Sequence, residues 1–218
     1  MNDFKKIKMG LSCLTRNDCY LLENDLSERS ITHKLAEYYQ VLFRRWDVDC
    51  EYNKNLGHAK GITIDPKDLL DRMATNLEQQ NSYIQELFQN DLSSEDIRDL
   101  KTQLEDPKVD YMEDLDLWVF LLRISKHKII KKTIFPDIIV HKRGTRSNHI
   151  VIEAKKTSNQ NPKSRLYDLL KLATLVSDPS YRYKKGIFIE LPVRSKFIPP
   201  VSFSQRRNSL GVYEYWPK

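Results

Sequence analysis

The sequence predicts an α/β fold: helices flank a mixed central sheet, and an acidic helical segment is inserted into a single domain spanning residues 1–218. Three observations predict this class. Residues 46–52 alternate apolar and polar side chains, as half-buried strands do. Apolar side chains recur every three or four residues over 27–43 and 162–177, as in amphipathic helices. Three further segments are rich in β-branched residues, which is typical of buried strands: 137–140, 149–155 and 186–191.

The first predicted helix begins near Ser27. Its apolar stripe comprises Ile31, Leu35, Tyr38, Tyr39, Leu42 and Phe43. Asp25 is a candidate N-cap, toward which Glu28 would reach back in a capping box. The alternating strand 46–52 follows directly, so this helix and strand form the first part of the predicted core.

Residues 66–127 differ from the rest of the chain in charge. They contain fourteen acidic and seven basic residues, a net charge of −7, whereas the remainder has 29 basic and 16 acidic residues, a net charge of +13. We predict an acidic insertion of two or three helices here. The basic body favours a polyanionic partner such as nucleic acid, although charge runs are more often solvated faces. The acidic helices are candidates for a protein contact, self-association or covering the basic surface; an inert insert is the alternative.

The segments 137–140 and 149–155 are expected to pair as a hairpin around a polar turn. If the numbers of paired residues sum to about 290, Asp137 lies opposite Glu153. Alternate residues of a strand point the same way, so Glu153 and Lys155 share one face, and Ala154 faces the other side, where a helix can pack. The hairpin therefore predicts a patch of two carboxylates and one ammonium group.

Two carboxylates at this distance repel each other unless a cation lies between them. Hard divalent ions such as Mg²⁺ take carboxylate oxygens and phosphate oxygens, and a bound ion can activate water. A neighbouring lysine can orient or activate that water, or stabilise charge on the phosphate. The alternative is a plain ion pair between Glu153 and Lys155 within the sheet.

Phe135-Pro136-Asp137, a spacer of fifteen residues and then Glu153-Ala154-Lys155 resemble the motif of the PD-(D/E)XK nuclease superfamily. The helix and strand that follow occur in that family's order, and the resemblance covers residues 27–56 and 129–191. It implies a restriction-endonuclease-like fold and Mg²⁺-dependent phosphodiester hydrolysis, with Mn²⁺ as a substitute. By this resemblance Asp137, Glu153 and Lys155 are catalytic, and Asp137 and Glu153 bind the metal.

The family often adds an acidic residue on its first helix, and Glu28 is the candidate third metal ligand, with the capping box as its alternative. Some branches carry Gln-x-x-x-Tyr on the later helix, which this sequence lacks. Asp168 and Lys171 stand there instead and are expected to form a surface pair of little energetic value. Residues 212–216 are expected to form a last edge strand or a packed tail.

Six basic residues near the predicted patch are candidate phosphate contacts: Lys142, Arg143, Arg146, Lys156, Lys163 and Arg165. Such contacts position a nucleic acid without reading its sequence. Tyr181 and Tyr183 alternate with basic residues and are candidates for stacking on bases.

The resemblance implies a nuclease, acting on DNA in preference to RNA and as an endonuclease rather than an exonuclease, in bacterial or phage defence, restriction or repair. The alternative is a catalytically inactive nuclease-fold module that binds nucleic acid or a protein partner. No apolar run approaches the about 20 residues of a membrane span, so no membrane partner is expected. The three cysteines lack paired spacing, which fits a reducing compartment and a cytoplasmic location.

Overall fold

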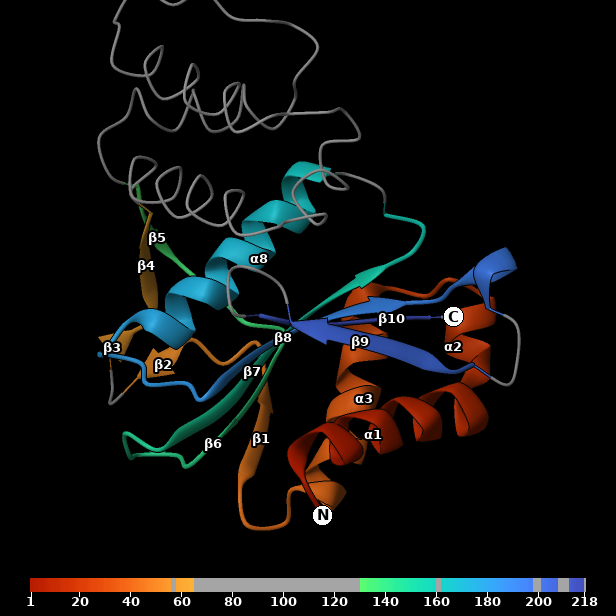
Figure 1. Cartoon of the computed structure of the whole chain (residues 1–218), viewed down its shortest axis with the longest axis horizontal. Coiled ribbons are helices and arrows are strands. Elements are labelled where there is room, and N and C mark those ends of the chain that lie inside the picture. The colour runs from red at the N-terminus through yellow and green to blue at the C-terminus, as the bar shows by residue number, and fades with distance from the viewer. Residues whose placement is uncertain (56–57, 65–129, 160–161, 198–200, 208–211, 218) are drawn as a thin grey trace, which may run out of the picture.

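A six-stranded mixed sheet forms the centre of the protein in the computed structural model (Figure 1). The structure describes residues 1–55, 58–64, 130–159, 162–197, 201–207 and 212–217. In the order in which they lie side by side, the strands are β1 (Asp47–Cys50), β6 (Ile138–His141), β7 (Asn148–Lys156), β8 (Lys185–Leu191), β10 (Tyr213–Pro217) and β9 (Phe203–Arg207). The predicted α/β class with a mixed sheet is confirmed. The predicted acidic insertion over 66–127 lies outside the described residues.

Helices cover both faces of this sheet (Figure 1). The elements α1 (Asp3–Asn17), α2 (Cys19–Glu23) and α3 (Glu28–Leu42) belong to the same hydrophobic cluster as Ile187 of β8. The preceding residue of the strand faces the other way: a side chain built at Gly186 would meet Leu172 and Val176 of α8 (Pro162–Ser177). The sheet is therefore buried between α1 with α3 on one side and α8 on the other.

The helix α1 was not predicted, although the sequence carries its signal. Asn2 is the N-cap, and its side chain accepts a hydrogen bond from the backbone N–H of Lys5 at 2.9 Å. Ile7, Leu11 and Leu14 follow at helical spacing and are fully buried. This apolar stripe packs against α3 and completes the core on that face.

The cap of α3 differs from the prediction. Ser27 is the N-cap, and its hydroxyl accepts a hydrogen bond from the backbone N–H of Ser30 at 3.1 Å. Asp25 lies outside the helix with φ of 49°, and its carboxylate pairs with Lys156 at 2.8 Å. The predicted capping box between Asp25 and Glu28 is therefore wrong, because long-range cations attract the Asp25 side chain. The side chain of Glu28, the first residue of the helix, is available for other contacts.

The hairpin register is the predicted one. Ile138 pairs with Ile152 and Val140 pairs with Ile150, so the residue numbers sum to 290 up to a bulge between Val140 and His141. Ala154 faces the α1 and α3 side, where it joins the hydrophobic cluster. The helix α8 then leads to β8, which pairs in parallel with β7, as expected for a β-α-β unit.

The C-terminal strand occupies an interior position. The strand β10 pairs in parallel with β8 and antiparallel with β9. A strand over 212–216 is thus confirmed, but its predicted edge position is wrong, because β9 covers it. Two short antiparallel pairs lie beside the main sheet, β2 (Lys54–Asn55) with β3 (His58–Ala59) and β4 (Gly61–Ile64) with β5 (Ile130–Thr133), and a 3₁₀ turn, η1, spans Arg194–Lys196. Among the helices that the structure describes, none is long and apolar enough to cross a membrane.

Candidate functional site

Charged side chains from four elements meet on the face of the sheet that α8 covers. We call this group the charged patch. It consists of four carboxylates and two lysines: Glu28, Asp137, Glu153, Asp168, Lys155 and Lys171. Asp137 lies immediately before β6 and two members lie on β7, while α3 contributes one residue and α8 contributes two. The predicted trio on the hairpin lies within this larger group.

Asp137 is held by the backbone of the neighbouring strand. Its carboxylate Oδ2 accepts a hydrogen bond from the backbone N–H of Ala154 at 2.8 Å. Its own carbonyl accepts a hydrogen bond from the N–H of Glu51 at 3.2 Å. Burial raises the pKa of Asp137 to about 6, although the Ala154 N–H favours the ionised form. The carboxylate is thus fixed in position and costly to ionise.

Glu153 has one satisfied and one unsatisfied oxygen. Its side chain is only 1% exposed, and Oε2 lies 2.6 Å from the ammonium nitrogen of Lys171. The other oxygen, Oε1, is buried without a hydrogen-bond partner among the described residues. Burial, with the nearby charge of Asp137, raises the pKa of Glu153. A buried carboxylate oxygen without a partner is costly, and the native structure of a binding site is one setting where it occurs.

Lys155 lies between two carboxylates. Its ammonium nitrogen is 2.9 Å from Oε1 of Glu28 and 3.0 Å from Oδ2 of Asp168. Burial opposes the charge, but these two carboxylates outweigh burial, so the pKa of Lys155 is raised. Lys155 is therefore protonated at neutral pH.

Asp168 and Lys171 are part of the patch, and the predicted surface pair is wrong. Their residues are only 4% and 7% exposed, and Lys171 lies 3.1 Å from Oδ1 of Asp168 one helical turn away. The sequence does contain a signal: Asp168, Lys171, Leu172 and Leu175 follow the spacing of a buried helical face. Two charged residues on a helical face that is otherwise apolar are a sign that the sheet packed against this face carries compensating charges.

Glu28 contacts a lysine in this structure. One oxygen pairs with Lys155, and the other accepts a 3.4 Å hydrogen bond from the backbone N–H of Lys156. Within the described ranges, no group of three or more His, Cys, Asp or Glu side chains is arranged to hold a metal ion. The role of Glu28 as a third ligand, beside Asp137 and Glu153, stays a prediction.

The donor set nevertheless fits a divalent cation. Four carboxylates and two ammonium groups leave a charge of −2 when all six are ionised. A buried surplus of this kind is unfavourable unless a cation compensates it or a carboxyl group takes up a proton, as the raised pKa values of Asp137 and Glu153 indicate for the metal-free protein. Hard divalent ions prefer carboxylate oxygens, and the unpartnered Oε1 of Glu153 is such an oxygen.

Three of the predicted phosphate contacts form ion pairs within the protein. The Nε of Arg143 donates to Asp49 at 2.8 Å. The ammonium group of Lys156 pairs with Asp25, and Arg165 pairs with Glu190 at 3.0 Å. Their charges are therefore balanced by neighbouring carboxylates, which weakens their attraction for phosphate.

Two other predicted contacts, Lys142 and Arg146, are exposed in the turn between β6 and β7. The side chain of Lys163 lies outside the described part of the structure. Tyr181 and Tyr183 are buried, and the hydroxyl of Tyr181 accepts a hydrogen bond from the N–H of Gly61 at 2.8 Å. The prediction that these two tyrosines stack on bases is wrong, because they pack in the protein interior.

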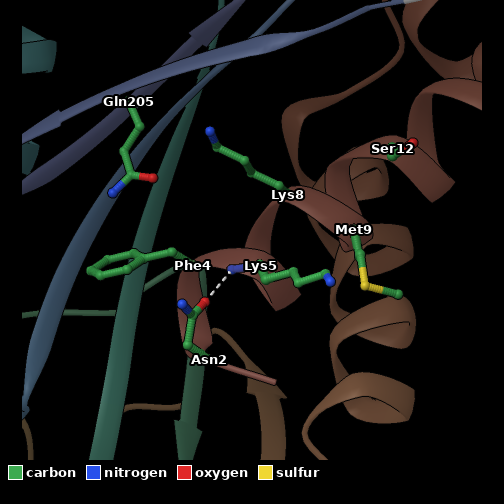
Figure 2. A pocket seen from close by; sticks show the side chains of 7 residues that line it. All are labelled: Asn2, Phe4, Lys5, Lys8, Met9, Ser12 and Gln205. Atoms are coloured by element: carbon green, nitrogen blue, oxygen red, sulfur yellow. Dashed lines mark hydrogen bonds between the residues drawn. The ribbon is translucent and has the colours of Figure 1, made fainter.

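A second surface feature is a hollow of about 400 Å³ beside α1. It is lined by Asn2, Phe4, Lys5, Lys8, Met9, Ser12 and Gln205. Figure 2 shows that Lys8 extends toward Gln205, whereas Lys5 extends in another direction, toward Met9. The two ammonium groups do not converge on one point, so the charged patch is the better candidate for a functional site.

Comparison with protein-family models, with curated proteins and with solved structures finds no match to this chain. Its function is therefore inferred from the chemistry of the charged patch. Within that patch, buried carboxylates with raised pKa values stand beside a protonated lysine, an arrangement typical of functional sites.

The raised pKa of Asp137 implies that the stability of the protein depends on pH. Its usual value of 3.8 is raised to about 6, so between these values the folded protein holds a proton that the unfolded chain releases. The stabilisation is complete below about pH 4 and is lost as the pH rises through 6. In EDTA, Asp137→Asn should therefore become progressively more stable than the wild type from pH 4 to 7, by up to about 3 kcal/mol.

Urea denaturation at several pH values measures this difference. Asp49→Asn is the matched control on the adjacent strand, because Arg143 and His141 lower the pKa of Asp49 despite its burial. Because this lowered pKa titrates below pH 4, the stability of Asp49→Asn relative to the wild type should stay nearly constant from pH 4 to 7. A stability difference for Asp137→Asn that does not depend on pH would contradict the raised pKa.

Proposed function

We propose that this protein is a metal-dependent nuclease that hydrolyses phosphodiester bonds of nucleic acid, DNA in preference to RNA. The observation that carries this proposal is the unpartnered, buried Oε1 of Glu153 within a patch whose ionised charge is −2. Asp137 directly precedes the adjacent strand β6, and the protonated Lys155 lies two residues further along β7. This combination supports a site for a divalent cation next to a fixed positive charge.

Asp137 and Glu153 would hold Mg²⁺, and Mn²⁺ would substitute. The Ala154 N–H fixes Asp137, and Lys171 fixes one oxygen of Glu153, so each carboxylate is already restrained. When bound, the ion supplies positive charge to the phosphate and a water of lowered pKa. Glu28 would join as a third ligand by exchanging its contact with Lys155.

Lys155 would act as a cation. Because the pKa of Lys155 is raised, its ammonium group keeps its proton at neutral pH and is unsuited to remove one from water. It can donate a hydrogen bond to a phosphate oxygen on which negative charge develops during hydrolysis. Of the roles considered from the sequence, charge stabilisation is thus favoured over activation of water.

Substrate binding would involve the turn between β6 and β7. Lys142 and Arg146 are exposed there, whereas Arg143, Lys156 and Arg165 are already paired with carboxylates. Contacts of this kind fix the register of a nucleic acid without reading bases. An endonuclease of this type would suit restriction, repair or defence in bacteria or phages, with its targeting supplied by a partner.

Cleavage assays test the proposal directly. Supercoiled plasmid, linear DNA and RNA are incubated with the protein in Mg²⁺, in Mn²⁺ and in EDTA. We expect metal-dependent cleavage of plasmid by the wild type and by the control Asp49→Asn, and no cleavage by Asp137→Asn. Equal cleavage by wild type and Asp137→Asn would show that the assigned site is wrong.

A second candidate function is binding without cleavage. Lys155 is engaged by Glu28 and Asp168, which favours a structural use of the same charges. A protein of this kind would bind DNA with an affinity that falls steeply with salt, and would show no turnover with any metal or substrate. Binding measured over a salt series, beside the cleavage assays, separates the two functions.

A further inference from the structure

The helix α8 joins the two lysines of the charged patch through one carboxylate. Asp168 Oδ2 lies 3.0 Å from Lys155, and Asp168 Oδ1 lies 3.1 Å from Lys171. Lys171 in turn contacts Glu153, and Lys155 contacts Glu28. The contacts form a continuous chain from α3 through β7 and α8 and back to β7.

The sheet does not create this chain by itself. Glu153 and Lys155 share a strand face, yet no direct ion pair between them occurs among the described residues. Each is held instead by a residue of α8: Lys171 holds Glu153, and Asp168 holds Lys155. The orientation of both candidate catalytic side chains thus depends on α8.

These contacts also determine which oxygens are left for a ligand. Lys171 occupies Oε2 of Glu153 and leaves Oε1 as the unpartnered oxygen. Each oxygen of Asp168 lies within ion-pair distance of a lysine, and its Oδ2 makes no hydrogen bond among the described residues. The pair on α8 thus contacts both candidate catalytic side chains of β7.

Packing alone gives no reason for these two charges. Leu169, Leu172 and Leu175 of α8 are fully buried and supply apolar contacts to the fold. Replacing a buried ion pair by apolar residues of similar volume is often neutral or stabilising. An apolar core could replace the whole group of Glu153, Lys155, Asp168 and Lys171 without a necessary loss of stability, so packing alone does not explain why these positions are charged.

We propose that Asp168 and Lys171 are positioning residues of the charged patch. Lys171 holds Glu153 so that Oε1 faces the ligand, and Asp168 holds both Lys171 and the ammonium group of Lys155. The expected effect of these two residues on cleavage rests on the proposed nuclease function. Their effect on the position of Lys155 can be measured without any reaction.

The test uses Asp168→Asn in the full chain, which preserves the size of the side chain and removes its charge. Asp3→Asn is the matched control: Asp3 pairs with Lys185 at 2.6 Å, with both side chains about one-fifth exposed, and lies on α1. Three quantities are measured: the single-turnover rate on plasmid, the Kd for Mn²⁺ by calorimetry without DNA, and the labelling rate of Lys155 by acetic anhydride, read by mass spectrometry.

For Asp168→Asn we expect a cleavage rate lowered by about tenfold to a hundredfold and faster labelling of Lys155, with a Kd for Mn²⁺ weakened by no more than about tenfold because the patch loses one negative charge. Asp3→Asn should leave all three unchanged. Unchanged labelling of Lys155 would overturn the positioning role, and a large loss of Mn²⁺ affinity would make Asp168 a metal ligand. If the wild type cleaves no substrate, the proposed function fails, and the labelling rate alone decides the positioning role.

Discussion

Lys155→Met is expected to slow DNA cleavage by about a hundredfold or more while leaving Mn²⁺ binding intact. The protonated ammonium group shares a strand face with Glu153; in the proposed function it would supply charge to the phosphate and would not be a metal ligand. Its removal changes the ionised charge of the patch from −2 to −3, so the affinity for Mn²⁺ should be equal or higher. In Lys155→Met the cleavage rate is thus expected to fall, while the affinity for Mn²⁺ stays equal or rises.

The adjacent lysine is the control for this variant. Lys156 has a similarly buried side chain, 19% exposed against 14% for Lys155, and pairs with Asp25 on the other side of the strand. Lys156→Met should cleave nearly as fast as the wild type, and Lys155→Arg should recover part of the rate. Parallel loss of cleavage and Mn²⁺ binding in Lys155→Met would contradict the separate role assigned to the ammonium group.

Lys171→Met is expected to lower the free energy of unfolding by about 3–5 kcal/mol at pH 8. Lys171 is the only described cation within ion-pair distance of Glu153, and its loss leaves a buried carboxylate without compensation. At pH 5 the loss should be smaller, because protonation removes the unpaired charge of Glu153. Urea denaturation of the metal-free protein in EDTA measures both values.

The single variant Glu153→Gln and the double variant Glu153→Gln/Lys171→Met complete a double-mutant cycle that measures the interaction of the two side chains. Removing both charges should restore most of the stability that Lys171→Met loses, because no unpaired carboxylate remains. Additive losses in the double variant would mean that the two side chains do not interact in solution. The same double variant should not cleave DNA, since Glu153 is a proposed metal ligand.

Local sequence predicted the hairpin that carries the site. Alternation along β7 assigned Glu153 and Lys155 to one face and Ala154 to the other, and the polar turn set a register in which residue numbers sum to 290. These features depend on the two-residue period of a strand and on a short connection, both of which a single sequence shows. Asp137 follows from the same register.

The partners of the charged side chains could not be predicted in the same way. Glu28 and Lys155 are 127 residues apart in the chain, and Asp25 is used by Lys156 rather than by its own helix. An ion pair between distant residues leaves no periodic pattern in the sequence. The assignment of Asp168 and Lys171 to the surface was wrong because charged residues are usually exposed. The sequence does not show the distant residues, Glu153 and Lys155, that pair with them in the interior.

The sequence by itself determined the order of the core elements from α3 to β8, the face of each hairpin strand and the chemical type of the candidate site, but not α1 or β9. Only the tertiary structure decided which charges neutralise one another, that α8 completes the patch through Asp168 and Lys171, and that one oxygen of Glu153 is left without a partner. The physical reason is range. Strand periodicity acts between neighbours along the chain, whereas the balance of buried charges depends on which distant elements share one low-dielectric interior.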